Sequence, residues 1–333
     1  MSNNISTLGN IVSVDGQESI ANVTWVVTDG TPGMENQALG LAERLDLPVT
    51  VKRIRLRGPW SALAPLSLGR PGAAPDSDPI APPFPRVAIG VGRQSIPFMA
   101  AIKRESRGRT LTVQCQDPRV SARRFDLVVP PEHDSLSGEN VFPILGSPNR
   151  ITLARIDQAR ERFVGRFALL PTPRLGVLIG GRNKVFRFDE TVVTQLADTL
   201  RQLSANMGLM VTPSRRTGAE NIARIATALE GTGAYIWNGE GENPYLGVLG
   251  WADAFLVTAD SVNMACEAAA TGKPVHIFSL PGGSPKFSSF HHALAARGIS
   301  RVFEGGIGQW QYQPLDETGR AAHHVQELLS KPL

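Results

Sequence analysis

Residues 254–278 restrict the fold of this chain more than any other segment. Two apolar runs of strand length, Ala254–Thr258 and Pro274–Phe278, enclose a stretch that starts with polar residues and ends near a glycine. These boundaries predict a helix over Val262–Ala270. A helix between two short apolar strands indicates a parallel sheet, because parallel neighbours need a long crossover connection.

The start of this helix is a predicted anion-binding site. Asp260 or Ser261 would be the N-cap, and the first N–H groups of the helix would lie at the carboxyl edge of the sheet without intrahelical partners. Such N–H groups and the helix dipole favour phosphate. Glu267 lies two turns further along an otherwise apolar helix, from where its side chain could still contact a ligand at that edge.

Length and composition predict a protein of two domains. The 333 residues suit two domains that are each large enough for a hydrophobic core. The contents of 42% apolar and 19% charged residues are ordinary for a soluble globular protein. The net charge of +4 is spread along the chain without a Lys/Arg tract, which argues against a nucleic acid partner and weakly favours anionic ligands or an anionic membrane surface.

The two cysteines and the first residues predict the compartment. Cys115 and Cys266 lie in predicted buried elements, so we expect free thiols in a reducing compartment. The first twenty residues lack the basic and apolar regions of a signal peptide, and the chain has no run of about 18 apolar residues. We therefore expect a cytoplasmic protein, at most peripheral to the inner membrane.

Strands and helices alternate in both halves of the chain. This pattern predicts an α/β fold with two Rossmann-like lobes whose parallel sheets face a central cleft. Among the predicted elements are a helix at Asn36–Leu45 and a strand at Val141–Ile144. The predicted domains are a flexible tail at 1–22, a first lobe at 23–170 with a Pro-rich excursion at 58–85, a second lobe at 171–310, and a C-terminal helix within 311–333 that packs back on the first lobe.

A polar cluster, DGTPGMENQ, follows the first predicted strand and leads into a helix. Its glycines permit close approach of a ligand to the backbone, and the helix start offers N–H groups. The cluster lacks the G-x-G-x-x-G spacing of dinucleotide sites. The alternative is a turn in which Glu35 and Asn36 only cap the helix. We interpret Gly33, Glu35, Asn36 and Gln37 as candidate acceptor-binding residues of the first lobe.

Two further clusters of the first lobe contain candidate catalytic groups. Asp117 lies in QDPR, and Glu132 and His133 lie in PPEHD; both clusters follow predicted strands. A histidine between carboxylates could be a general base with a raised pKa, although a surface loop histidine is the commoner case. The residues do not distinguish among these three candidates. Neither cluster has the ligand spacing of a metal site, so we predict no metal.

Two basic loops follow strands of the second lobe, GGRNK at 180–184 and PSRRT at 213–217. Cationic side chains that converge on a helix N-terminus would bind a diphosphate. Either loop alone could be solvated surface, but three such loops after three strands favour an anion site. The segment NGEGEN at 238–243 would line the site beside the base or the sugar, unless it is only a mobile loop. The candidate donor residues are Gly180, Gly181, Arg182, Ser214, Arg215, Asn238, Asp260, Ser261 and Glu267.

The run ADSVNMACEAAATGKPVHIF resembles the donor-site segment of GT-B glycosyltransferases. In that fold a helix start holds the diphosphate of a nucleotide sugar, and a glutamate along the helix holds the ribose. The resemblance implies that Ser261 contacts phosphate and that Glu267 contacts the ribose. From about Trp25 to Thr318 the chain is also similar to the mitochondrial fission ELM family, through DGTPGMENQALGLAERL, QDPR, FDLVVPPEHD, SRRT, WNGEGENPYLG, TADSVNMACEA and TGKPV.

These resemblances imply a GT-B-like fold and three functions to distinguish. Our leading hypothesis is a metal-independent glycosyltransferase that needs no cofactor, takes a nucleotide-diphosphate sugar as substrate, and acts on a lipid-linked or membrane-surface acceptor. In plants the family implies a factor that recruits the fission dynamin, so the first alternative is a non-catalytic adaptor with a protein partner. The second alternative is a GT-B-like nucleotide-sugar epimerase. Bacterial members of the family also carry the label nucleoside-diphosphate-sugar epimerase. The absence of the dinucleotide fingerprint from this chain does not favour that label.

Overall fold

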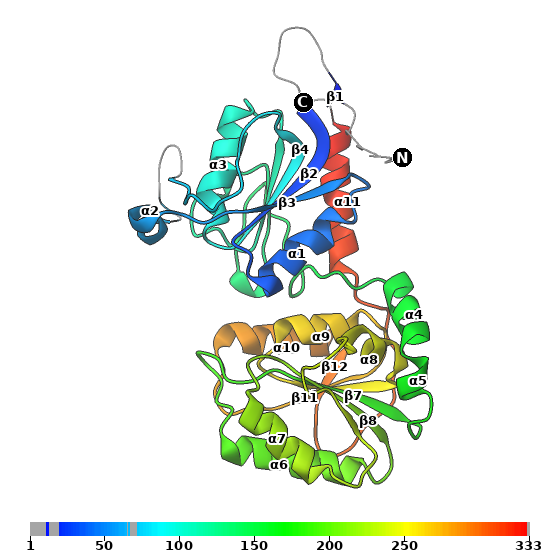
Figure 1. Ribbon diagram of the computed structural model, residues 1–333. Coiled ribbons are helices and arrows are strands. Elements are labelled where there is room, and N and C mark those ends of the chain that lie inside the picture. Colours follow the sequence, from blue (N-terminus) through cyan, green and yellow to red (C-terminus); the bar gives the residue numbers. More distant parts are fainter. Residues whose placement is uncertain (1–10, 13–19, 65, 67–71, 332–333) are drawn as a thin grey trace, which may run out of the picture. The chain divides into compact units, whose positions relative to one another are not determined.

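The chain forms two compact α/β units (Figure 1). The computed structural model describes residues 11–12, 20–64, 66 and 72–331. Unit 1 comprises Met1–Arg150 and Glu317–Leu333, and unit 2 comprises Ile151–Asp316. Each unit contains a six-stranded sheet in which parallel pairing dominates. The predicted fold class, α/β with two Rossmann-like lobes built on parallel sheets, is confirmed.

The sheet of unit 1 has the strand order β3-β2-β4-β5-β6, and all of these neighbours are parallel. The short strand β1 pairs antiparallel with the start of β2. The strands are β1 (Ile11–Val12), β2 (Ile20–Thr28), β3 (Val49–Arg53), β4 (Pro85–Val91), β5 (Leu111–Cys115) and β6 (Leu127–Val129).

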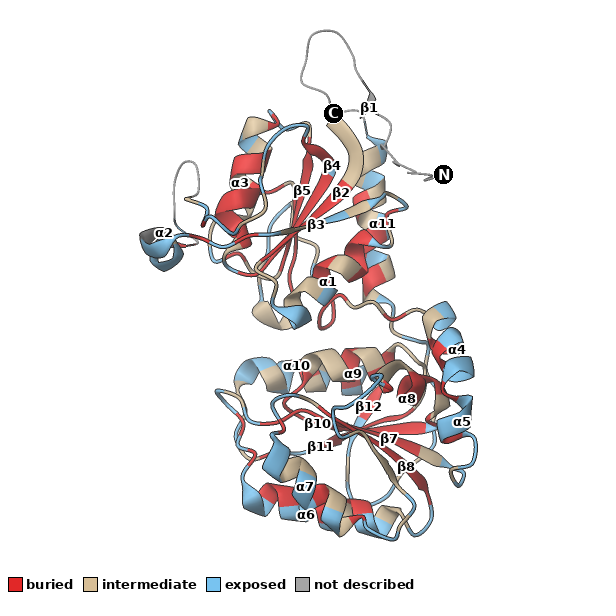
Figure 2. Cartoon of the chain, viewed as in Figure 1, coloured by how far each residue is buried: buried red, intermediate tan, exposed pale blue. Residues whose placement is uncertain are grey.

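Helices cover both faces of this sheet, as a parallel sheet requires. Val26 belongs to a core shared with α1 and α11, whereas its neighbour Trp25 belongs to a core shared with α3, because successive strand side chains point to opposite faces. Figure 2 shows the buried residues along these strands. The helices of unit 1 are α1 (Pro32–Ala42), α2 (Gly58–Leu63), α3 (Ser95–Glu105) and α11 (Glu317–Ser330), with 3₁₀ turns η1 (Ala122–Arg124) and η2 (Glu132–Asp134).

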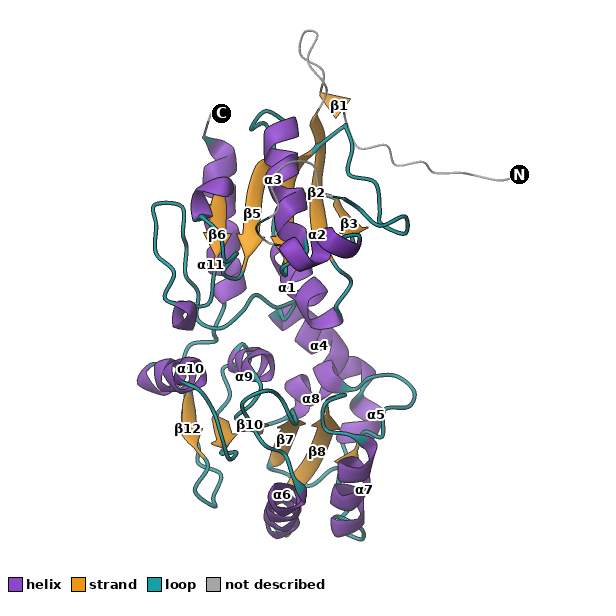
Figure 3. Ribbon diagram, turned by 90° about the vertical axis from the view of Figure 1, so that its left-hand side faces the viewer, coloured by secondary structure: helices purple, strands orange, loops and turns teal. Residues whose placement is uncertain are grey.

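The sheet of unit 2 is parallel throughout, in the order β12-β11-β10-β7-β8-β9. Helices α8 and α9 lie on one side of it, and α6 and α7 lie on the other (Figures 1 and 3). Its strands are β7 (Arg174–Ile179), β8 (Gly208–Pro213), β9 (Tyr235–Ile236), β10 (Ala254–Thr258), β11 (Val275–Phe278) and β12 (Ser300–Val302). Its helices are α4 (Leu153–Arg162), α5 (Val164–Phe167), α6 (Glu190–Leu203), α7 (Ala219–Ala228), α8 (Tyr245–Trp251), α9 (Val262–Ala269) and α10 (Pro285–Ala296).

The boundary between the units lies at Arg150, about twenty residues before the predicted one. Helices α4 and α5 belong to unit 2 because α4 packs closely against α8. A Cβ on Gly247 would come within 2.7 Å of the Phe163 ring, and one on Gly250 within 3.1 Å of Arg160 Cβ, so only glycine fits there without a shift. The predicted boundary at 170 is therefore wrong, because the glycines of α8 let the preceding helices pack closely against unit 2.

Three smaller expectations for unit 1 need revision. Helix α1 begins at Pro32 rather than Asn36, since proline at the first helical position needs no N–H partner. The segment predicted as a strand at 141–144 forms two isolated bridges instead, one to β6 and one to Pro131. Within the predicted flexible tail, Ile11–Val12 pairs with β2. The rest of 1–19 lies outside the described residues.

The remaining predicted segments are placed as follows. The Pro-rich excursion contains α2, ends where β4 begins at Pro85, and includes 65 and 67–71, which lie outside the described residues. Helix α11 packs on α1 within unit 1. Cys115 and Cys266 are buried and form no disulfide. Among the described residues, no helix combines the length and apolar character that crossing a membrane requires.

Candidate functional site

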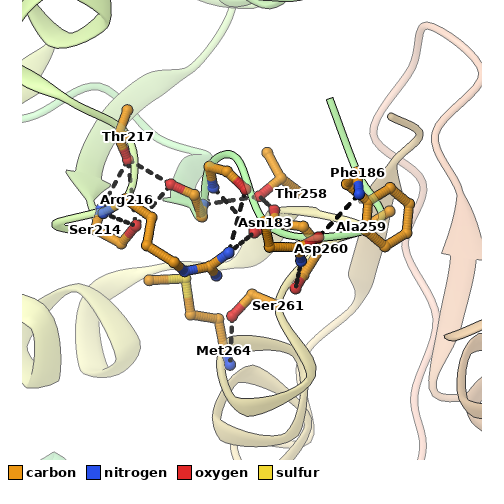
Figure 4. Close-up of polar contacts among 12 residues, drawn as sticks. Asn183, Phe186, Ser214, Arg216, Thr217, Thr258, Ala259, Asp260, Ser261 and Met264 are labelled. Atoms are coloured by element: carbon orange, nitrogen blue, oxygen red, sulfur yellow. Dashed lines mark hydrogen bonds and ion pairs between the residues drawn. The ribbon is translucent and has the colours of Figure 1, made fainter. Parts of the chain in front are cut away.

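The carboxyl edge of the unit 2 sheet has a topological switch point between β7 and β10. The sheet continues through β8 and β9 on one side of β7, and through β10, β11 and β12 on the other. Chain connections leave in opposite directions at such a point, and open parallel sheets bind ligands in the crevice that results. The loops that meet there, Gly180–Gly181, Ser214–Thr217 and Thr258–Ser261, are called the three-loop junction below. Figure 4 shows polar contacts of Ser214, Arg216, Thr217, Thr258 and Asp260 within it.

Asp260 is the centre of the three-loop junction. Its carboxylate is fully buried and accepts hydrogen bonds from the Gly181 N–H at 2.9 Å and the Thr258 hydroxyl at 2.7 Å. Arg216 forms an ion pair with it, with 2.7 Å between Nη1 and Oδ2 (Figure 4). Of the two predicted N-caps of α9, Asp260 is not the one used, because both of its carboxylate oxygens bind groups of the surrounding loops. Its predicted contact with a phosphate stays a prediction.

Ser214 and the two glycines also shape the junction. The Ser214 hydroxyl donates to the Gly180 carbonyl at 2.6 Å, and the Thr217 hydroxyl donates to the same oxygen. A Cβ on Gly180 would overlap with the Asp260 carboxylate, and one on Gly181 would overlap with the Arg216 carbonyl. The glycines therefore permit close packing between loops, and their predicted contact with phosphate stays a prediction.

The N-terminus of α9 opens at this junction, as the sequence predicts. Ser261 is the N-cap, since its hydroxyl accepts a hydrogen bond from the Met264 N–H at 3.4 Å. The other first-turn N–H groups have no intrahelical acceptor, and the positive end of the helix dipole lies at the same place. An anion bound beside Ser261 would thus meet backbone donors.

Exposed cations surround the junction. Arg182, Lys184 and Arg215 are exposed, and within the described part of the chain none of them forms a hydrogen bond or an ion pair through its side chain. Arg216 differs from them because it pairs with Asp260 and donates to the Gly181 carbonyl at 3.2 Å. Of the adjacent arginines 215 and 216, one builds the junction and the other is available to a ligand.

Glu267 lies on α9, two turns after Ser261, and is half-buried. The Tyr245 hydroxyl, from the start of α8, donates to Oε2 of Glu267 at 2.5 Å. Burial raises the pKa of Glu267 to about 7, an effect that the hydrogen bond from Tyr245 opposes. The Tyr245 pKa is raised by burial and by the neighbouring carboxylate. This pair joins the start of α8 to the interior of the predicted nucleotide site.

Asn238 lies in an exposed turn rather than in the three-loop junction. Its side chain accepts from the Glu240 N–H at 3.0 Å and donates to the Glu240 carboxylate at 3.2 Å. None of its hydrogen bonds among the described residues reaches the loops after β7, β8 or β10. The side chain of Asn238 therefore shapes its own turn, and its predicted contact with a ligand stays a prediction.

The candidate acceptor residues lie along the first turns of α1 in unit 1. Glu35 forms a bidentate ion pair with Arg53, at 2.8 and 3.0 Å, and does not cap the helix, whose N-cap is Thr31. Gln37 is buried and accepts from the Gln116 side chain at 2.9 Å. Gly33 and Asn36 are exposed on the same turns. Arg53 and Gln116 connect β3 and the end of β5 to this helix. Neither was predicted as a site residue, although Gln116 lies in the QDPR cluster.

The three candidate catalytic residues follow β5 and β6, which are neighbours in the sheet. Asp117 accepts from the Arg119 N–H at 2.8 Å and pairs with the Arg119 guanidinium at 3.2 Å. Glu132 and His133 lie in η2, and the Glu132 N–H donates to the Ile144 carbonyl at 2.8 Å. The roles of all three stay predictions. Within the described chain, no cluster of three or more His, Cys, Asp or Glu could hold a metal ion.

The chain resembles known proteins in its sequence and in its fold. The family profile described as Mitochondrial fission ELM1 matches residues 32–329. The chain belongs to this family. Among ELM1-family relatives, the Mitochondrial fission protein ELM1 of Arabidopsis thaliana is 32% identical over 275 residues, which cover 74% of this chain and 64% of the plant protein. An uncharacterized protein of Rickettsia prowazekii is 25% identical and aligns over 92% of this chain and 98% of its own.

Two solved structures that resemble this ELM1-family chain are UDP-GlcNAc 2-epimerases. The UDP-GlcNAc 2-epimerase of Methanocaldococcus jannaschii matches with a TM-score of 0.58 at 9% identity, over 93% of this chain and 99% of that one. The epimerase of Neisseria meningitidis bound to UDP-GlcNAc matches with a TM-score of 0.51 at 10% identity, over 93% and 92%. At such low identity these matches show the fold, which is GT-B-like as the sequence predicts.

Proposed function

We propose that unit 2 binds a nucleotide-diphosphate sugar and that the protein transfers the sugar to an acceptor. The observation that carries the proposal is the three-loop junction, where Asp260 fixes the loops and Arg182, Lys184 and Arg215 stay available beside the start of α9. A helix N-terminus flanked by cations suits a diphosphate. The GT-B-like fold supports the same assignment, since a similar Staphylococcus aureus structure, at a TM-score of 0.50, contains UDP.

In the proposed reaction the acceptor hydroxyl oxygen bonds to the anomeric carbon of the sugar. The bond from that carbon to the diphosphate oxygen breaks, and its electron pair stays on the leaving diphosphate. The cationic side chains and the α9 N–H groups would stabilise this charge. The proton of the acceptor would pass to one of the candidate bases on unit 1, His133, Glu132 or Asp117, which lie at the ends of neighbouring strands.

A nucleotide titration tests the proposal. We expect UDP, GDP or CDP, or one of their sugars, to raise the melting temperature, because a ligand that binds only the folded state stabilises it. At 100 times the dissociation constant the gain would be about 2.7 kcal/mol. If none of these compounds changes the melting temperature, the transferase proposal fails and the adaptor alternative gains support. If one nucleotide sugar alone is converted to an epimer without an acceptor, the epimerase alternative holds instead.

We further propose that the acceptor is presented at a membrane surface. Helix α2 lies at the periphery of unit 1 (Figure 1). Leu63 of this helix is 57% exposed and the nearby Leu66 is 68% exposed, and together they form what we call the apolar flap. The side chain of Arg93, two residues after the end of β4, donates to the Ala62 carbonyl at 2.9 Å and to the Ala64 carbonyl. This anchor attaches the flap to the carboxyl edge of the sheet, where the candidate acceptor residues also lie.

A liposome assay tests the flap. No acidic residue occurs from Ile54 to Pro75, so an anionic bilayer would meet no negatively charged side chain in this segment. Sedimentation with phosphatidylglycerol vesicles should fall at least tenfold in the double variant Leu63→Glu, Leu66→Glu, because each leucine loses about 1.5–3 kcal/mol of burial. Leu169→Glu, at a leucine of unit 2 that is 94% exposed, is the control. Equal sedimentation of all three proteins would reject the flap as the membrane contact.

A further inference from the structure

The hydroxyl of Tyr245 links an exposed segment of unit 2 to the interior of the predicted nucleotide site. Tyr245 is the first residue of α8, separated from the segment Asn238–Asn243 by Pro244 alone, and its hydroxyl donates to the Glu267 carboxylate on α9. We propose that Tyr245 is a positioning residue that holds Glu267 for the ribose hydroxyls of the nucleotide, and that it makes the 238–243 segment part of that site. This inference rests on the proposed function.

The 238–243 segment is anchored at both ends, which gives Tyr245 a fixed position. Asn243 accepts a hydrogen bond from the Tyr245 N–H at 3.0 Å, and Glu242 pairs with Arg162 of α4 at 2.7 Å. At the other end, the Trp237 indole donates to the Glu240 carbonyl at 3.1 Å. Between these anchors, Gly239 and Gly241 have φ of +93° and +70°, a conformation that other residues rarely adopt. A ligand that moved this segment would therefore act on Tyr245.

The chemistry of the pair fits recognition of a diol. A carboxylate has about four acceptor positions, and the bond from Tyr245 uses one on Oε2, so the opposite oxygen can accept from ribose hydroxyls. A charged acceptor forms stronger hydrogen bonds than a neutral one. Tyr245 donates to the ionised form of Glu267 and thereby favours it, whereas burial favours the neutral form. Tyr245 thus orients the carboxylate and also maintains its charge.

Few other groups act on this pair. Cys266, next to Glu267 on α9, adds to the raised pKa of Tyr245. Among the described residues, Glu267 has no ion pair, and Tyr245 is its side-chain hydrogen-bond partner. Since the folded-state pKa of Glu267 is raised to about 7, the charged acceptor is present above that pH and is lost as the pH falls through it. Nucleotide affinity should follow the same curve.

The test compares UDP and GDP with their 2′-deoxy forms at pH 6 to 9. We expect the wild-type protein to prefer the ribonucleotide above about pH 7. Tyr245→Phe should weaken ribonucleotide binding about tenfold at pH 7, and the affinity should recover at pH 9. The midpoint of the dependence of affinity on pH should move to higher pH, because Glu267 loses the donor that favours its charged form. Glu267→Gln should bind weakly at every pH and should not distinguish the deoxy forms.

Tyr312→Phe is the matched control. It removes another mostly buried tyrosine hydroxyl of unit 2, which donates to the Lys273 carbonyl at 2.7 Å, and it should leave the pH midpoint unchanged. Suppose that the wild-type protein binds nucleotide, but that Tyr245→Phe either keeps the wild-type pH midpoint of affinity or loses affinity equally at every pH. The inference about Tyr245 is then overturned, whereas the proposed function stands. If the wild-type protein binds no nucleotide, both fall, and a carbon-13 NMR titration of Glu267 then shows whether Tyr245 controls its charge at all.

Discussion

Asp260→Asn is expected to abolish nucleotide binding and to lower the melting temperature. Asparagine keeps the volume of the side chain but loses the charge. Its NH₂ group would face either the Thr258 hydroxyl, which now donates to Oδ1, or both the Gly181 N–H and Arg216, which now bind Oδ2. Removing one partner of a buried ion pair costs about 3–5 kcal/mol. We expect the lower end of that range, because Arg216 is 40% exposed and can regain water.

Calorimetry and nucleotide titration together measure this effect. A suitable control is Asp189→Asn, since Asp189 caps α6 by accepting from the Val192 N–H and asparagine caps helices equally well. The control should keep the wild-type melting temperature and affinity. Wild-type nucleotide affinity in Asp260→Asn would contradict the view that the three-loop junction creates the site, even if the protein were less stable.

The single variant Ser261→Ala separates the role of Asp260 from that of the helix start. Ser261→Ala should cost only about 1 kcal/mol of stability, the usual value for an N-cap, because the three loops would still be joined. Asp260 therefore contributes to the shape of the whole crevice, whereas Ser261 contributes to one end of one helix. The Asp260 carboxylate contacts Gly181, Arg216 and Thr258, one from each of the three loops, whereas the Ser261 hydroxyl contacts only the first turn of its own helix.

The sequence predicted the elements of the site better than their contacts. The strand, helix and strand at 254–278 have the expected order, and α9 ends one residue before the predicted end. Local signals determine these features, namely apolar runs, a polar cap and a terminal glycine. The parallel arrangement follows from the same alternation.

Contacts between loops depend on tertiary structure, and there the sequence was insufficient. Arg215 and Arg216 are identical in type and adjacent, and only the direction of the turn after β8 decides that Arg216 meets Asp260. Likewise, nothing near Tyr245 in the sequence indicates Glu267, which lies 22 positions away. The glycines of α8 could have indicated close helix packing, since Gly247 and Gly250 lie on one helical face.

Replacing both Arg182 and Arg215 by glutamine is expected to weaken binding of a nucleoside diphosphate by about 100-fold. A hydrogen bond to a charged group contributes about 1.5–3 kcal/mol, and solvent reduces this for exposed side chains. Since neither arginine has a partner among the described residues, the melting temperature of the free protein should not change. The loss of affinity would then reflect the ligand alone, which isothermal titration measures.

A nucleoside without phosphate provides the sharpest comparison for this variant. Uridine or guanosine should bind the double variant and the wild-type protein equally, because the removed charges would face only the diphosphate. Raising the salt concentration should weaken diphosphate binding to the wild-type protein more than to the variant. Arg107→Asn is the control: it removes an exposed arginine at the amino edge of the unit 1 sheet, and asparagine tolerates its φ of +56°. Suppose instead that the double variant binds diphosphate within twofold of the wild-type affinity. That result would show that these arginines do not bind phosphate. The α9 N-terminus and Lys184 would then be the remaining anion-binding groups beside the junction.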